Sequence, residues 1–190
     1  MFPPCRLIIR SAAFSYKYDG PLDLRLNPEA GISAAERLRT VARDELEGML
    51  IENADEPYAK EISQAVTRAL RKGKKIDTTF ALRDLIAEAL DFLPKDEKKE
   101  AIKKSCARTF QALRIAVNHE LDALEEGLDT IFAHLAPGGR LCVITFHSLE
   151  DRLVKNKFRR WSTALHLPAG VPGVRLRRQG QGKADHTQTH

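Results

Sequence analysis

The sequence predicts a mixed α/β fold, in which a small all-helical unit is joined to part of an α/β sheet. Two observations carry this prediction. Apolar residues recur at helical spacing through residues 29–105, which is typical of amphipathic helices that pack together. Beyond residue 106, a long helical pattern, a Pro-Gly-Gly turn, a short apolar run and another helical pattern follow in that order. This order is typical of a sheet with crossover helices.

The all-helical unit is indicated by its start signals as well as by its spacing. Ser33 and Glu36 form a capping box, in which each side chain satisfies the backbone amide of the other residue. Thr78 or Thr79 is expected to cap a later helix. The charged residues 95–104 are either a linker or a solvated short helix.

Residues 106–165 have a different character. A long helical pattern ends at Pro137-Gly-Gly, because proline and glycine cannot continue a helix. Residues 140–146 are apolar and rich in β-branched side chains, which predicts a buried strand. A further helix is expected from His147 to about Trp161. One strand and two helices cannot bury a sheet alone, so this part is expected to be the last third of a larger core.

His147 and Ser148 follow the predicted strand directly. In open α/β sheets, ligands bind beyond the carboxyl ends of the strands, so these two residues are candidate catalytic residues. Each also has a structural alternative. Ser148 and Asp151 show the pattern of a capping box, and His147 can be a partly buried histidine whose hydrogen bonds are satisfied.

A second group of candidates lies on one predicted helix. Arg108, Gln111, Arg114 and Asn118 follow one another at spacings of three and four, so they share a helix face. Two arginines and two amides can hold phosphates and base edges at once. The alternative is a polar helix face that is hydrogen-bonded to a neighbouring loop, and the spacing favours neither.

The first 28 residues are expected to be loop or extended structure. Asp19-Gly-Pro has the composition of a turn. Asp23 and Arg25 follow shortly after it and can form a simple surface pair.

The charge pattern permits a polyanionic partner. The formal net charge is +5, and eight lysines and arginines lie between Arg152 and Arg178 with no acidic residue among them. Such a run suits nucleic acid, because neutralising phosphates releases counterions. A solvated helix face followed by a basic tail is the alternative, and residues 166–190 are expected to be a disordered basic tail.

The composition argues against a membrane protein and against a disulfide scaffold. No apolar run approaches the roughly 20 residues needed to cross a bilayer. The three cysteines, Cys5, Cys106 and Cys142, are odd in number and far apart, and they form no CxxC pair. A reducing cytoplasm is the expected location.

Three stretches taken together resemble one known family. They are Phe14-Ser-Tyr with Asp19-Gly-Pro-Leu-Asp-Leu-Arg, Arg108-Thr-Phe-Gln-Ala-Leu-Arg with Asn118-His-Glu-Leu, and Pro137-Gly-Gly-Arg-Leu with Phe146-His-Ser-Leu-Glu-Asp-Arg and Val154-Lys. From about Ala13 to Arg160, the sequence is similar to the MraW-type family of ribosomal RNA small-subunit methyltransferase H enzymes. These enzymes methylate the exocyclic N4 of a cytidine with S-adenosylmethionine.

The resemblance implies a partial class I, Rossmann-like methyltransferase core with an all-helical insertion domain. Residues 1–28 and 106–165 would belong to the core, and residues 29–105 would be the insertion that recognises the substrate. His147 and Ser148 would line the cytosine pocket. The loop beside the methyl donor would be shaped by Asp19 and Asp23. The expected RNA-binding residues are Arg108, Gln111, Arg114, Asn118, Arg152 and Lys155.

The donor-binding block of the family has no counterpart in this sequence. A Gly-Gly-His loop after the first strand, an acid after the second and an Asp-Leu-Gly segment after the fourth are all absent. Both ends are expected to be replaced or truncated relative to the family, and no donor-binding residue is assigned. The implied cofactor of the enzyme is S-adenosylmethionine, and its implied partner is small-subunit ribosomal RNA or the ribosomal subunit. Two other functions stay open: a non-catalytic RNA-binding module and an inert remnant of the enzyme.

Overall fold

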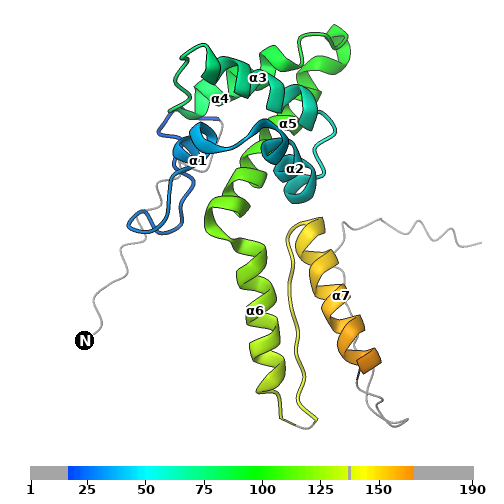
Figure 1. Cartoon of the computed structure of the whole chain (residues 1–190). Helices are drawn as coiled ribbons and strands as arrows, with labels where there is room; N and C mark the ends of the chain where they lie inside the picture. Colours follow the sequence, from blue (N-terminus) through cyan, green and yellow to red (C-terminus); the bar gives the residue numbers. More distant parts are fainter. Residues whose placement is uncertain (1–16, 137, 165–190) are drawn as a thin grey trace, which may run out of the picture. The chain divides into compact units, whose positions relative to one another are not determined.

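A computed structural model of the chain describes residues 17–136 and 138–164, which form two compact units. The first unit ends at Ala123 and the second begins at Leu124. The described part of the first unit holds α1 (Ala34–Thr40), α2 (Arg43–Ala54), α3 (Ala59–Arg71), α4 (Thr79–Ala89) and α5 (Lys95–Asn118). Helix α6 (Glu120–Ala133) passes from the first unit into the second, which also holds α7 (Ser148–Ala164) (Figure 1). The predicted basic tail, residues 166–190, and most of the predicted N-terminal loop lie outside the described residues.

Both predicted helix starts in the first unit are confirmed. The Ser33 side chain accepts a hydrogen bond from the Glu36 N–H, and the Glu36 carboxylate accepts one from the Ser33 N–H at 2.8 Å. At the start of α4, the Thr78 side chain accepts a hydrogen bond from the Ala81 N–H. These bonds satisfy amides that the first turn of a helix leaves without an internal partner.

Helix α5 starts earlier and stops sooner than the sequence pattern indicates. Residues 95–104, expected as a linker or a short helix, are its first turns. It ends at Asn118, because His119 takes a left-handed conformation with φ of 50°. The single long helix expected before Pro137 is therefore two helices, α5 and α6.

The predicted boundary between residues 105 and 106 falls inside α5, and the first compact unit continues to Ala123. A compact unit is defined by contacts, whereas an insertion is defined by the continuity of a family core. The division into insertion and core therefore stays a prediction.

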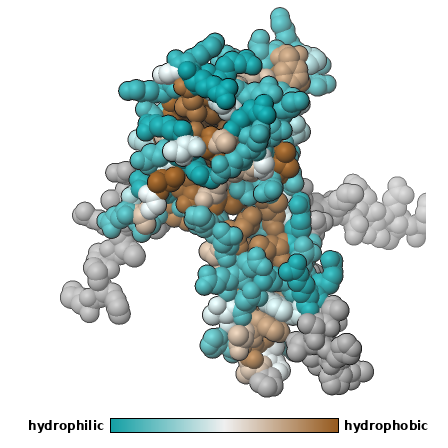
Figure 2. All heavy atoms as spheres, in the orientation of Figure 1, coloured by the Kyte–Doolittle hydropathy of each residue, from teal (hydrophilic) through white to brown (hydrophobic). Residues whose placement is uncertain are grey.

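The core of the first unit lies between its helices. Helix α5 packs against α1, α2 and α4, and α3 packs against α2 and α4. Burying one leucine or isoleucine stabilises the fold by about 1.5–3 kcal/mol, so these short helices depend on one another. On the face seen in Figure 2, hydrophilic residues cover most of the described surface of this unit. The largest fully buried side chains include Leu38, Leu46, Leu50, Ile62, Leu82, Ile86 and Leu113.

The segment that precedes α1 is attached to the helices by its backbone. The Leu22 N–H donates to the Asp77 carbonyl at 2.9 Å, and the Ala35 N–H donates to the Leu22 carbonyl at 2.9 Å. Leu22 and Leu24 are each 1% exposed and belong to the core. Leu24 has φ of 62°, a left-handed conformation that costs a residue with a side chain about 1–2 kcal/mol. The packing of the first unit must therefore hold this loop in place.

The second unit packs α7 against α6 and against the segment between them. Its small core is formed by Leu128, Val154 and Phe158, with Leu141, Val143 and Trp161 among the partly buried side chains around it. Lys157 of α7 lies 2.7 Å from the carboxylates of both Asp129 and Glu125 on α6. Its hydrogen bonds to these two groups raise the pKa of the Lys157 ammonium.

The buried strand predicted at residues 140–146 does not form in the described structure. No strand occurs anywhere in residues 17–136 or 138–164. Leu141 and Val143 pack on the core of the second unit, whereas Ile144 is 70% and Phe146 is 91% exposed. This alternation has the period of a strand with one covered face. A strand also needs neighbouring backbone to bond with, and the described residues provide none, so the expected α/β core is not observed.

Within residues 17–136 and 138–164, no helix combines the length and the apolar content that crossing a bilayer requires.

Candidate functional site

His147 caps the first turn of α7. The Asp151 N–H donates to the His147 carbonyl at 3.1 Å, and the Glu150 N–H donates to His147 Nδ1 at 3.4 Å. The Glu150 carboxylate accepts a hydrogen bond from the Phe146 N–H at 2.8 Å. The predicted capping box of Ser148 and Asp151 is therefore replaced by His147 and Glu150, because the helix begins at Ser148 itself.

The ring of His147 is a hydrogen-bond donor in this arrangement. Because Nδ1 accepts from the Glu150 amide, the neutral ring carries its proton on Nε2. Nε2 lies 3.2 Å from Glu150 Oε1. That contact lacks hydrogen-bond geometry, so Nε2 is buried without a hydrogen-bond partner among the described residues. His147 can donate to an acceptor, but it cannot accept a proton at Nε2 without changing tautomer and giving up the cap.

The other candidates of the second unit lie on one face of α7. Ser148 and Arg152 are exposed, and Lys155 is partly buried. Their spacings of four and three place the three side chains on the same side of the helix. Lys155 Nζ donates to Asp151 Oδ2 at 2.6 Å. Such a pair at i and i+4 contributes only a few tenths of a kcal/mol, about 0.2–0.5.

Of the four candidates on α5, the side chains of Gln111, Arg114 and Asn118 form hydrogen bonds within the first unit. Gln111 Nε2 donates to the Asn53 carbonyl at 3.2 Å. Arg114 makes two hydrogen bonds to the Glu120 carboxylate, at 2.9 and 3.0 Å. Arg108 is partly buried, and within the described part of the chain it forms no hydrogen bond or ion pair. Arg108 is thus available to an external ligand.

Asn118, the fourth candidate, holds the loop that precedes α1. Its Oδ1 accepts from the Leu26 N–H at 2.7 Å, and its Nδ2 donates to the carbonyls of Leu24 and Arg114, both at 2.8 Å. Both amide hydrogens and one acceptor site are therefore occupied. These contacts agree with the alternative of a polar helix face bonded to a neighbouring loop. They also hold Leu24 in its left-handed conformation.

The two loop aspartates, Asp19 and Asp23, also accept hydrogen bonds from groups of the first unit. Asp19 Oδ1 accepts from the N–H groups of Gly20 at 3.1 Å and Phe80 at 3.3 Å, which attaches the loop to the start of α4. Asp23 forms two hydrogen bonds with the Arg25 guanidinium, at 2.6 and 3.0 Å. The hydrogen bond that Arg25 donates to Asp23 raises the pKa of the Arg25 guanidinium.

The candidates fall into the two units. Asp23 and Asn118 come together at the loop of residues 23–26 in the first unit, whereas His147 and its neighbours on α7 belong to the second. Sequence reasoning missed Glu120 and Glu150, the partners of Arg114 and His147. A signal was present, since Glu150 lies three residues after His147, the spacing of a reciprocal cap.

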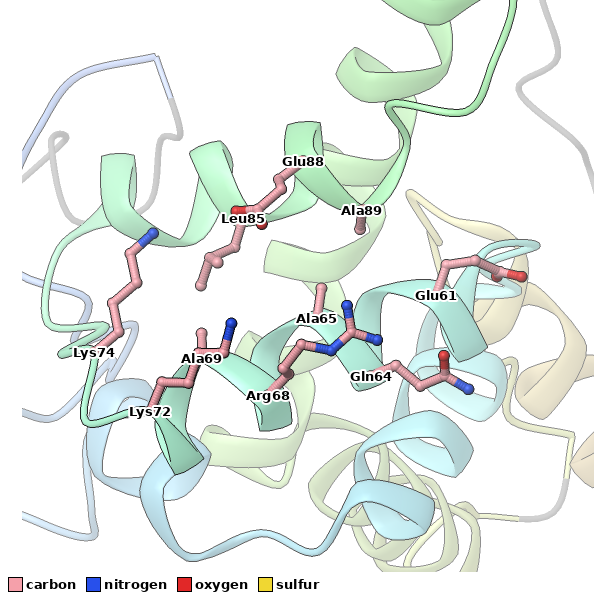
Figure 3. Close-up of a pocket in the computed structure, with 10 residues that line it drawn as sticks. All are labelled: Glu61, Gln64, Ala65, Arg68, Ala69, Lys72, Lys74, Leu85, Glu88 and Ala89. Atoms are coloured by element: carbon pink, nitrogen blue, oxygen red, sulfur yellow. The ribbon is translucent and has the colours of Figure 1, made fainter.

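Sequence reasoning also missed a pocket between α3 and α4. Its volume is about 310 Å³, and its walls are rich in charged side chains (Figure 3). The polar residues that line it are Glu61, Gln64, Arg68, Lys72, Lys74 and Glu88.

The described residues form no metal centre, and the thiol of Cys106 is not reactive. They contain no group of three or more His, Cys, Asp or Glu side chains that could hold a metal ion. Cys106 is buried, and burial raises the pKa of its thiol to about 12. A thiol with so high a pKa is not a nucleophile at neutral pH.

Comparison with known proteins gives the family. The family model described as the MraW methylase family matches residues 6–184, which include both described units. The chain belongs to the MraW methylase family.

Curated relatives of this MraW-family chain carry names of ribosomal RNA methyltransferases. It is 60% identical over 146 residues to "Ribosomal RNA small subunit methyltransferase H 1" of Lachnoclostridium phytofermentans, an alignment that covers 77% of this chain and 40% of that protein. A protein of the same name from Agathobacter rectalis is 60% identical over 142 residues, or 75% of this chain and 41% of the relative. "Ribosomal RNA small subunit methyltransferase H" of Thioalkalivibrio sulfidiphilus is 44% identical over 88% of this chain and 51% of the relative. The chain spans about half or less of the length of these relatives.

S-adenosylmethionine, which the resemblance to this family implies, does not fit the described residues of this MraW-family chain. Nucleotide-type cofactors in Rossmann-like folds approach a glycine-rich turn between a strand and a helix. Gly138 and Gly139 instead follow α6 and lead into an extended segment. The pocket between α3 and α4 is not an apolar cleft, because charged side chains of both signs line it. No step through the donor is therefore derived from these residues.

Proposed function

We propose that this chain supplies the RNA-recognising part of an S-adenosylmethionine-dependent methyltransferase that modifies a cytidine N4 in small-subunit ribosomal RNA. The observation that carries the proposal is the 60% identity, over 77% of the chain, to a protein named as a ribosomal RNA small subunit methyltransferase. The alignment covers 40% of that relative. Methyl transfer is accordingly proposed for the enzyme that contains this part, not for residues 17–164 alone.

The chemistry of the target defines what the protein must do. The amino group of cytosine is a poor nucleophile, because its lone pair is delocalised into the ring. The base must be unstacked, held by its polar edge and oriented toward the methyl donor. His147 is proposed for the holding role, since its Nε2 has no hydrogen-bond partner among the described residues while Nδ1 keeps the cap of α7. The exposed hydroxyl of Ser148 lies next to it in the chain.

The proposed RNA contacts are three cations of α5 and α7. Arg108 has no internal partner in the described part of the chain, and Arg152 and Lys155 lie on the same face of α7 as Ser148. Cations on one helix face suit phosphates, whose neutralisation releases counterions. The remaining candidates act indirectly in this proposal, by fixing the loops around the RNA: Asp19, Asp23, Gln111, Arg114 and Asn118.

Residues 140–146 are proposed to be a strand of the Rossmann-like core in the complete enzyme. Leu141 and Val143 already pack on the core of the second unit. The exposed side chains of Ile144 and Phe146 would be covered by another layer of the complete enzyme. Neighbouring strands would supply the missing backbone partners. In this arrangement residues 1–28 and 106–165 belong to the core and residues 29–105 to the insertion.

Two titrations of the purified full chain test the proposal. We expect a fluorescently labelled single-stranded fragment of small-subunit ribosomal RNA to bind, with an affinity that falls steeply as salt rises. Arg108→Gln should weaken binding. Arg43→Gln, which removes an exposed arginine already paired with Asp44, is the matched control. RNA binding that is absent, or equally weak for both variants, would count against the proposed RNA-binding role.

A calorimetric titration with S-adenosylmethionine separates an enzyme part from an RNA-binding module. The module is favoured by the missing donor-binding motifs. We expect no heat from the chain alone. Co-expression with the N-terminal part of the Lachnoclostridium phytofermentans relative should restore methylation of small ribosomal subunits, read by mass spectrometry of the nucleosides. RNA binding without any restored methylation would support the non-catalytic module instead.

A further inference from the structure

The pocket between α3 and α4 has an ordered arrangement of charge. Figure 3 shows Lys72 and Lys74 at one end of it and Glu61 and Gln64 at the other, with Arg68 between them. The α3 residues 61, 64 and 68 and the C-cap residue 72 follow one another at spacings of three and four. One face of α3 therefore lines the pocket along its length, and α4 supplies the opposite wall.

The cations of this pocket are not neutralised by the protein. Within the described residues, the side chains of Arg68, Lys72 and Lys74 form no ion pair or hydrogen bond. By contrast, each arginine of α1, α2 and α4 is paired with a carboxylate: Arg37, Arg39, Arg43 and Arg83. The three positive charges along the pocket attract an anionic ligand, because their fields add.

Cations near the C-terminal end of a helix also occur for a purely structural reason, since they complement the helix dipole. That reason does not cover Lys74, which lies beyond the helix. Gly73, with φ of 78°, closes α3: its N–H donates to the Leu70 carbonyl at 2.9 Å, and the Lys74 N–H donates to the Ala69 carbonyl at 3.0 Å. This is the bond pattern of a Schellman motif. The motif fixes the backbone of Lys74 beside the pocket.

The size and the mixed charge of the pocket indicate the kind of ligand. A volume of about 310 Å³ is at the lower end of the range for small-molecule sites, roughly 300–1,000 Å³. The lining includes alanines such as Ala65 and Ala89, whose small side chains leave this space open. The cations suit a phosphate, whereas Glu61 and Glu88 can accept hydrogen bonds from ribose hydroxyls or a base amino group. One nucleotide unites these chemical groups in a molecule of suitable size.

We propose that the pocket between α3 and α4 takes one nucleotide of single-stranded RNA, with its phosphate held by Arg68, Lys72 and Lys74. This inference rests on the proposed function, because it assumes that the chain binds RNA. It adds an RNA contact in the helical unit that is separate from Arg108 on α5 and from the residues of α7.

The test measures binding of the labelled single-stranded ribosomal RNA fragment to the full chain by fluorescence anisotropy at several salt concentrations. The triple variant Arg68→Gln, Lys72→Gln, Lys74→Gln should lower the slope of log affinity against log salt by about 0.7, since the three cations hold one phosphate and each phosphate contact on a single strand contributes about 0.7. Near 0.1 M salt the affinity should fall about 5-fold.

A control variant removes the same charge elsewhere on the first unit. Lys99, Lys103 and Lys104 are exposed on α5 and do not line the pocket. Changing all three to glutamine should have a much smaller effect than the pocket variant. Equal effects of the two triple variants would overturn this inference and leave the proposed function standing. A wild-type chain that binds no RNA would overturn both.

A second variant tests the pocket without changing its charge. Ala65→Leu fills the space between the helices with a side chain of high helix propensity. We expect it to weaken RNA binding while the far-UV circular dichroism and the unfolding midpoint stay near those of the wild type. RNA binding by this folded variant at wild-type affinity would show that RNA does not enter the pocket, and the inference would fail.

Discussion

The side chain of Asn118 joins the end of α5 to a loop more than 90 residues earlier in the chain. Asn118→Ala removes its bonds to the Leu26 N–H and the Leu24 carbonyl, at 2.7 and 2.8 Å. A hydrogen bond of this kind contributes about 1 kcal/mol net. Leu26 is 68% exposed, and water can replace part of its bond, whereas Leu24 is 1% exposed. We expect a loss of about 1–2 kcal/mol in the free energy of unfolding.

Urea unfolding of the full chain, followed by far-UV circular dichroism, measures this loss. The midpoint should fall by about 0.5–1 M. Hydrogen exchange should speed up at the Leu26 amide, because its acceptor is gone. Asn53→Ala is the control, since the Asn53 side chain makes one long bond, 3.4 Å, to the Ala112 carbonyl. If the two variants lose the same stability and the Leu26 amide exchanges as in the wild type, Asn118 does not hold the loop.

Three further predictions concern the buried polar cluster, an exposed carboxylate and the thiols. Ser105→Ala removes the 2.8 Å hydrogen bond to Glu56, which is 3% exposed. We expect the free energy of unfolding, measured with urea, to fall by about 1–3 kcal/mol. An unchanged free energy of unfolding would contradict this contact. Hydrogen bonds from Ser33 lower the pKa of Glu36 from its ordinary value of 4.5. Its contribution to stability is therefore present above pH 4.5 and is lost as the pH falls through the lower folded-state value; Glu36→Gln should lack this part of the pH dependence of unfolding. Burial raises the pKa of the Cys106 thiol to about 12, so iodoacetamide at neutral pH should modify the exposed Cys142 and spare Cys106; peptide mass spectrometry that finds both equally modified in folded protein would contradict the burial of Cys106.

Local sequence patterns predicted the parts of the fold that depend on neighbours in the chain. The capping box of Ser33 and Glu36 and the cap at Thr78 form as expected, since each bond spans three residues. The cap of α7 is different in detail, because His147 Nδ1 competes with the Ser148 hydroxyl for the amides of the first turn. A side chain that can both cap and catalyse cannot be assigned from spacing alone.

The sequence by itself determined the helical character of residues 29–105, the family and the positions of the polar residues along α5 and α7. Only the tertiary structure decided what those polar residues contact. Asn118 and Gln111 bond to backbone 92 and 58 residues away, and no local pattern specifies such partners. Tertiary structure also decided that residues 140–146 form no strand, since a ladder requires backbone from another segment. Caps and turns are satisfied by near neighbours, whereas strands, loop clamps and pockets depend on which distant segments the fold brings together.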